Sequence, residues 1–134
     1  MPEIVAKMNS IVGEDLLLWR AHFFDKRPGA KKFPWHQDYD YWCLEPPVII
    51  PAWIAIDRVA REKACMQFIP GSHRKLLPHV KAPPDMAFLE MADPTHVDSN
   101  LMIELELEHV EFILLNERLL HQSDVNISIL QRCG

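Results

Sequence analysis

A histidine and a carboxylate stand two residues apart in the segment Pro34-Trp35-His36-Gln37-Asp38-Tyr39. Side chains at positions i and i+2 of a strand project from the same face, so His36 and Asp38 can point at one centre. With a second imidazole they would complete the two-histidine, one-carboxylate set that holds Fe(II) by one face and leaves positions open for chemistry. The pair alone is a weak signal, because polar strand residues of this spacing are common. The third ligand has to come from elsewhere in the chain.

Strands are the elements that would position such a site. Only residues 1–12 approximate the apolar spacing of a helix. In residues 101–108, leucine or isoleucine occupies every odd position and glutamate occupies 104, 106 and 108, the pattern of a half-buried strand. A turn or bulge is expected near His109, where the alternation changes phase. Further strands are predicted at 16–24 (as a buried strand), around His36 and Asp38, at 48–56 and at 65–69. The pattern indicates an antiparallel double-stranded barrel or sandwich in one domain, residues 1–134.

Composition narrows the classes of partner. The net charge of −5 gives no general basic surface for nucleic acid or an anionic membrane, and no apolar run is long enough to span a bilayer. Three widely spaced cysteines and the lack of a signal-like N-terminal stretch predict a reducing, cytoplasmic location. Residues 74–100 are irregular, with four prolines, and are expected to hold a lid or a substrate loop.

Four separated blocks of sequence resemble the phytanoyl-CoA dioxygenase family in order and spacing, from about residue 13 to the end. They are Trp35-His36-Gln37-Asp38, Trp53-Ile54-Ala55-Ile56-Asp57, Phe68-Ile69-Pro70-Gly71-Ser72-His73, and Leu120-His121-Gln122-Ser123 with Asn126 and Arg132. The resemblance implies a double-stranded β-helix (a jelly-roll, cupin-like core) with little flanking helix. It also implies an oxygenase that depends on Fe(II), 2-oxoglutarate and O₂.

The same resemblance assigns residues to roles. It implies that His36, Asp38 and His121 are the metal ligands and the catalytic centre. It implies that Arg132 binds the far carboxylate of 2-oxoglutarate, with Ser123, Trp53 and Gln37 lining the cosubstrate pocket. If His121 and Arg132 lie on neighbouring antiparallel strands, the two side chains are expected roughly opposite each other, and the planar guanidinium suits a carboxylate. Asp38 argues against a halogenase, in which a small residue at this position leaves room for chloride.

Two stretches depart from the family pattern. Gln122 follows the distal histidine where glycine is common, and Glu108-His109-Val110-Glu111 replaces a stretch that usually contains a Gly-Asp or Gly-Gln pair. Both changes predict added bulk near the site. The chain stops two residues after Arg132, so a truncated member is expected, with a double-stranded β-helix incomplete at its C-terminus and an open sheet edge through which copies could associate.

The leading hypothesis is therefore a dioxygenase that hydroxylates a small organic substrate while 2-oxoglutarate is converted to succinate and CO₂. The alternative is a catalytically impaired remnant that binds a ligand or a protein partner. A third hypothesis is a cupin-like metal enzyme that works without 2-oxoglutarate, but such an enzyme would have no use for a carboxylate anchor at Arg132 and Ser123. Neither nucleic acid nor membrane is expected as a partner.

Overall fold

The computed structural model describes residues 2–41, 44 and 48–134. This part of the chain contains one α-helix and ten short strands. The helix is α1 (Pro2–Val12), and the strands are β1 (Asp25–Lys26), β2 (Phe33–His36), β3 (Ala52–Ile54), β4 (Met66–Phe68), β5 (His79–Lys81), β6 (Glu90–Ala92), β7 (Ile103–Leu105), β8 (Phe112–Leu114), β9 (His121–Ser123) and β10 (Arg132–Cys133). Short 3-10 turns lie at Asp38–Tyr41, Arg61–Lys63, Ser72–Arg74, Pro94–His96 and Ser99–Leu101.

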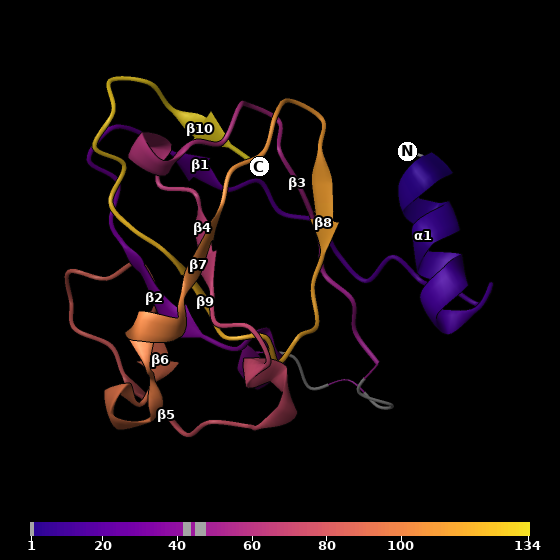
Figure 1. The fold of residues 1–134 in the computed structure, drawn as a ribbon, viewed down its shortest axis with the longest axis horizontal. Coiled ribbons are helices and arrows are strands. Elements are labelled where there is room, and N and C mark those ends of the chain that lie inside the picture. The colour runs from indigo at the N-terminus through magenta and orange to yellow at the C-terminus, as the bar shows by residue number, and fades with distance from the viewer. Residues whose placement is uncertain (1, 42–43, 45–47) are drawn as a thin grey trace.

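Eight of the strands form the walls of the barrel. The largest sheet has the order β2-β9-β4-β7, and two antiparallel pairs, β1-β10 and β3-β8, complete the walls, while β5-β6 is a separate ribbon. Figure 1 shows the pair β1-β10 at the top and the ribbon β5-β6 at the bottom, with the four-stranded sheet between them. All paired strands are antiparallel. The predicted double-stranded β-helix is confirmed.

The core is made of apolar side chains that face into the barrel. One cluster contains Trp35, Ile69, Leu77, Ala92 and Leu120, and the others lie around β3, β4 and β8. Leu120 is 1% exposed, and burying such a side chain contributes about 2 kcal/mol. Because Leu120 immediately precedes His121, this packing fixes the strand that carries the distal histidine.

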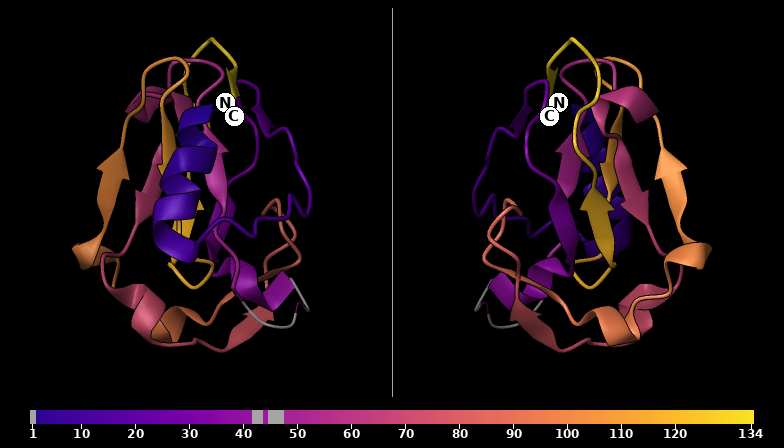
Figure 2. Two further views of the ribbon diagram at one scale, coloured as in Figure 1. Left: turned by 90° about the vertical axis from the view of Figure 1, so that its right-hand side faces the viewer. Right: turned by 90° about the vertical axis from the view of Figure 1, so that its left-hand side faces the viewer.

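The segment 16–24 is not the buried strand that its apolar run predicts. It contains no strand, and the exposed fractions are 86% for Leu17, 83% for Leu18 and 81% for Phe23. Among the described residues, its backbone pairs with the barrel only at Phe24, which exchanges hydrogen bonds with Gly134. An apolar run folds as a buried strand only where a neighbour supplies both a ladder and a covering layer, and Figures 1 and 2 show α1 and this segment beside the barrel.

The end of the chain also differs from expectation. Residues 132–133 form β10, which pairs with β1 in the register Asp25↔Cys133 and Lys26↔Arg132. The Arg132 side chain is therefore anchored in the barrel wall, with an exposed fraction of 1%. The partner of β10 is β1 and not β9, so Arg132 does not lie opposite His121 as predicted.

The turn expected near His109 is confirmed, and it contains a strained residue. Residues 106–111 separate β7 from β8, and Val110 has a φ of 63°. A β-branched side chain in the left-handed region is a rare outlier, because its Cβ crowds the backbone. This is the stretch in which the family usually has a glycine.

Replacing Val110 by glycine should stabilise the protein by about 1 kcal/mol. Relief of left-handed strain stabilises the folded state by roughly 1–2 kcal/mol. The greater freedom of glycine in the unfolded chain offsets about 0.4–1 kcal/mol of this gain. Urea unfolding should show a higher midpoint with an unchanged slope. The matched control is Val80→Gly in β5, where the backbone is an ordinary strand and glycine should destabilise. A lower midpoint for Val110→Gly would contradict the strain argument.

No helix in the described ranges is both long enough and apolar enough to cross a bilayer.

Candidate metal centre

The two histidines of the site face each other across neighbouring strands. In the antiparallel pair β2-β9, His36 lies opposite His121. Their ring centroids are 4.2 Å apart. Both side chains are buried, with exposed fractions of 4% for His36 and 8% for His121. Register alone thus brings together two imidazoles that are 85 residues apart in the chain.

The carboxylate joins them from the turn after β2. Asp38 begins the 3-10 turn Asp38–Tyr41. Its Oδ1 lies 3.6 Å from Nε2 of His36 and 3.9 Å from Nε2 of His121. One ligand atom from each of the three residues lies within 4.8 Å of the others, the only such group of metal-ligating side chains found among the described residues.

The outer nitrogen of each ring is held by the backbone. Nδ1 of His36 lies 2.8 Å from the carbonyl oxygen of Pro34, and Nδ1 of His121 lies 2.8 Å from that of Leu119. Since a carbonyl can only accept, each Nδ1 carries the proton and donates it. Each Nε2 therefore keeps a lone pair directed at the shared centre, the arrangement that orients histidine ligands in metal sites.

The protonation states also suit a cation. Burial, followed by the neighbouring charge of His36, lowers the pKa of His121 to about 4, against the opposing charge of Asp38. Burial would raise the pKa of Asp38, but the adjacent His36 and His121 and the charge of Arg20 outweigh burial and hold the pKa below the usual value. A neutral imidazole and an ionised carboxylate are the forms that bind metals.

The donor set therefore fits a divalent transition metal. Two imidazole nitrogens and one carboxylate oxygen on one side of a centre are typical of non-heme Fe(II) sites with open positions. A closed structural zinc site would normally have four protein ligands, and the described residues offer three.

An arginine from β10, a serine from β9 and a tryptophan from β3 form a second cluster. Nη2 of Arg132 donates to Oγ of Ser123 over 2.9 Å and also to the carbonyl of Ala64. The guanidinium lies over the ring of Trp53, with 5.4 Å from Cζ to the centroid. Ser123 and His121 are two residues apart on one strand, so they project from the same face about 7 Å apart. The structure thus brings three of the predicted cosubstrate residues together beside the triad.

The model of the phytanoyl-CoA dioxygenase (PhyH) family matches residues 2–132. The chain belongs to this family. The chain spans about half the length of the curated relatives it matches: dioxygenase lolE1 of Epichloe uncinata is 27% identical over 119 residues, which cover 89% of this chain and 44% of the relative. Phytanoyl-CoA dioxygenase domain-containing protein 1 of Mus musculus is 29% identical over 136 residues, covering 95% of this chain and 46% of its own length.

Solved structures agree on the fold. The non-heme monooxygenase ThoJ, in its apo form, superposes with a TM-score of 0.84 at 23% identity, covering 98% of this chain and 49% of its own. EvdO2 of Micromonospora carbonacea var. aurantiaca, complexed with 2-oxoglutarate, has a TM-score of 0.73 at 24% identity, covering 98% of this chain and 54% of its own.

Gln122, which replaces a common family glycine, does not crowd the triad. Side chains alternate along β9, so Gln122 projects from the face opposite to His121 and Ser123. There its amide donates to Oε1 of Gln67 on β4, directly across the sheet. The expectation of added bulk at the site is wrong for this residue, because Gln122 lies on the opposite face of the sheet from His121.

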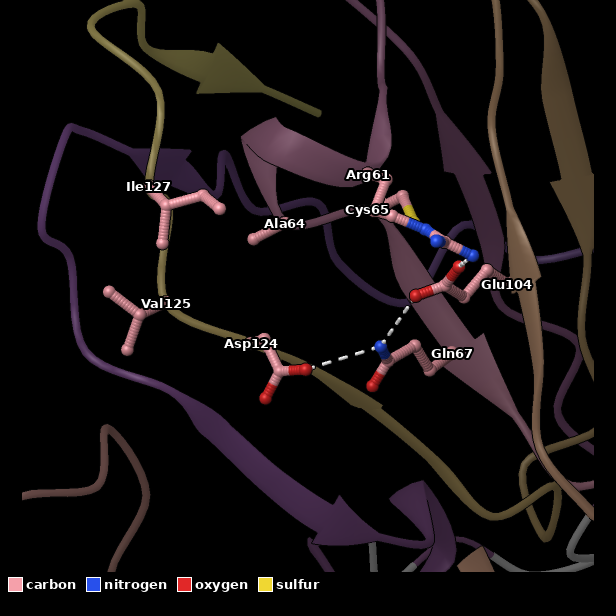
Figure 3. A pocket seen from close by; sticks show the side chains of 8 residues that line it. All are labelled: Arg61, Ala64, Cys65, Gln67, Glu104, Asp124, Val125 and Ile127. Atoms are coloured by element: carbon pink, nitrogen blue, oxygen red, sulfur yellow. Dashed lines mark hydrogen bonds and ion pairs between the residues drawn. The ribbon is translucent and has the colours of Figure 1, made fainter. Parts of the chain in front are cut away.

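That face carries a hollow of about 360 Å³, drawn in Figure 3, which is lined by both apolar and charged side chains. The amide of Gln67 donates to Glu104 over 3.1 Å and to Asp124 over 3.2 Å, and the acids also pair with Arg61 and Lys32. These paired charges tie β9, β4 and β7 together. They lie on the opposite face of the sheet from the metal triad.

Gln37 lies apart from the cosubstrate cluster. Its amide nitrogen donates to the carbonyls of Lys75 and Arg118, and its Oε1 accepts from the backbone N–H of Leu77 at 2.9 Å. The side chain is fully buried, so its polar atoms are already engaged in fastening the loop after β4. Its role as a cosubstrate contact stays a prediction.

Two residues of this family member escaped the sequence patterns. Phe88, within the predicted loop 74–100, sits edge-on to the His36 ring with centroids 4.7 Å apart, and it stacks on Phe33 at 5.0 Å. Lys26, in the basic segment between residue 25 and β2, is fully buried. No local pattern in this charged segment indicates that the lysine enters the barrel.

Proposed function

We propose that this chain carries the active centre of an Fe(II)- and 2-oxoglutarate-dependent dioxygenase that hydroxylates a small organic molecule, with His36, Asp38 and His121 as the iron ligands. One observation carries the proposal. Both Nε2 atoms face Oδ1 of Asp38 while both Nδ1 atoms are held by carbonyls. Membership of the family and the bound 2-oxoglutarate of EvdO2 support the choice of cosubstrate.

Bound Fe(II) would supply the activation of O₂ that couples decarboxylation of 2-oxoglutarate to oxidation of the substrate. The chain's own part is placement. Arg132 would hold the far carboxylate beside Ser123, and the two-residue step along β9 from Ser123 to His121 would direct the 2-oxo acid end toward the metal. Nη1 of Arg132 makes no hydrogen bond to any residue that the structure describes, so its N–H groups remain for a carboxylate.

Aromatic rings pack beside the triad. Tyr41 and Phe88 approach the His36 ring with centroids 6.0 and 4.7 Å away. The loop that carries Phe88 is tied to the strand entrance, since Ala87 N–H donates to the carbonyl of Lys32 at 2.9 Å. Apolar walls of this kind exclude water and favour a substrate with hydrocarbon character.

Anaerobic titration of the purified chain with Fe(II) and then 2-oxoglutarate tests the proposal. A visible charge-transfer band should appear when the 2-oxo acid chelates the bound metal. Exposure to air should then release succinate, even without the unknown substrate. Iron binding without any effect of 2-oxoglutarate would favour a cupin-like metal enzyme. Failure to bind iron would favour the remnant that binds a ligand or partner, and either result would refute the proposal.

A further inference from the structure

Two buried cations stand directly opposite each other in the pair β1-β10. Lys26 on β1 is the register partner of Arg132 on β10, at the top of Figure 1. The exposed fractions are 0% for Lys26 and 1% for Arg132. Like charges directly opposite on antiparallel strands destabilise the pair, and lysine is almost never fully buried unless it is paired. This arrangement therefore needs a reason.

All three donors of the Lys26 ammonium are directed at the end of β9. Nζ donates to the carbonyl of Ser123 at 2.8 Å, to Oγ of Ser123 at 2.8 Å and to the carbonyl of Asp124. The ammonium also lies over the ring of Phe33, 4.4 Å from its centroid. Lys26 therefore fixes both the backbone and the hydroxyl of Ser123, and none of its three donors is left to contact a ligand.

The Ser123 hydroxyl is saturated by these contacts. Its oxygen accepts from Lys26 and, over 2.9 Å, from Nη2 of Arg132, while its proton goes to the carbonyl of Ala64 at 2.8 Å. A hydroxyl has two acceptor sites and one donor. Ser123 is therefore a fixed bridge between two cations, held in one rotamer before any ligand arrives.

The positive charge at this bridge is not neutralised within the described ranges. No carboxylate there forms an ion pair with Lys26 or Arg132. Asp124 is the nearest acid acting on Lys26, but its carboxylate is shared with Lys32 at 2.8 Å and with Gln67. Burial, and then the charge of Arg132, lower the pKa of Lys26 to about 7. An anion bound here would relieve the repulsion between the two cations.

We propose that Lys26 is a positioning residue for the cosubstrate: through Ser123 and through its charge, it makes the pocket select 2-oxo acids that carry a second carboxylate. This inference rests on the proposed function. Arg132 touches the far carboxylate, whereas Lys26 holds Ser123, the acceptor for Nη2 of Arg132, in place and adds the second positive charge. A monocarboxylic 2-oxo acid would bind the metal equally well but gain nothing from Lys26.

Two substitutions separate charge from hydrogen bonding. Lys26→Met keeps the length of the side chain and removes both, and Lys26→Gln keeps amide donors for Ser123 without the charge. Lys7→Met, on the exposed face of α1, is the matched control. The probes are 2-oxoglutarate and 2-oxobutyrate, titrated anaerobically into the Fe(II)-loaded protein and followed by the charge-transfer band. Thermal melting without ligand checks folding, and the shift produced by 2-oxoglutarate gives a second measure of binding.

Lys26→Met should weaken 2-oxoglutarate binding at least about tenfold, leave the affinity for 2-oxobutyrate unchanged, and abolish most of the thermal shift. The affinity of Lys26→Gln for 2-oxoglutarate should lie between the affinities of Lys26→Met and wild type. If the methionine variant does not fold, the glutamine variant alone tests the inference. Equal losses for both acids would show a merely structural lysine and overturn the inference. Unchanged 2-oxoglutarate affinity in both variants would also overturn it, while leaving the proposed function intact. Absence of the band in the wild-type protein would instead refute the proposed function, and the inference with it.

Discussion

Replacing Asp38 by alanine is expected to weaken Fe(II) binding by at least about 100-fold. Loss of a group that merely orients a metal ligand typically costs 10–100-fold in affinity, and Asp38 supplies the single negative charge of the triad. The variant should still fold, because Asp38 begins a short 3-10 turn at the edge of the site. Its lowered pKa means that the ionised carboxylate contributes stability above its unfolded pKa, so a slight loss is expected at neutral pH.

Competition with a chromogenic chelator, under anaerobic conditions, measures this affinity directly. His121→Ala should produce a similar loss, since it removes the imidazole that lies opposite His36. His96→Ala is the matched control, because His96 is exposed and lies outside the triad. Thermal melting with and without Fe(II) adds a second readout, as a ligand stabilises only a protein that binds it. Wild-type affinity in Asp38→Ala would rule out this centre as the metal site.

Arg132→Leu should leave Fe(II) binding unchanged and weaken 2-oxoglutarate binding by roughly 100-fold. The reason is the loss of a charge-assisted contact with the far carboxylate, worth about 1.5–3 kcal/mol. Folding should tolerate the change, because the carbonyl of Ala64 keeps its bond from Ser123 Oγ at 2.8 Å. The variant also removes a cation whose pKa is lowered by burial, together with its repulsion of Lys26.

Asp38→Ala and Arg132→Leu are therefore expected to separate metal binding from cosubstrate binding. Titration of 2-oxoglutarate into the Fe(II)-loaded protein, followed by the charge-transfer band, gives the affinity for the cosubstrate. Arg27→Leu is the control, because Arg27 is exposed and pairs only with Asp25 at 2.9 Å among the described residues. Equal 2-oxoglutarate affinity in wild type and Arg132→Leu would refute the anchor. Loss of iron binding in this variant would instead indicate a collapsed barrel.

The sequence by itself was enough for the family, the barrel class and the residues of the candidate centre. The two-residue spacing of His36 and Asp38 pointed to a shared centre, although only His36 lies on a strand and Asp38 reaches the centre from the turn after β2. Motifs separated by long loops gave His121, Ser123, Trp53 and Arg132, and the structure gathers these side chains near one another. The turn at His109 was visible as a slip in the alternation of residues 101–114.

Only the tertiary structure decided how the strands pair, because local sequence patterns do not specify which strands become neighbours. β10 pairs with β1 rather than β9, so Arg132 lies opposite Lys26, and a lysine from a charged stretch of sequence is fully buried. The alternation of side chains along β9 turns Gln122 away from the candidate metal centre, and a distant loop brings Phe88 against His36. The apolar run 16–24 remains exposed because no strand or helix of the described chain packs over it. Hydrophobic side chains favour burial, but burial needs a neighbouring element that covers them.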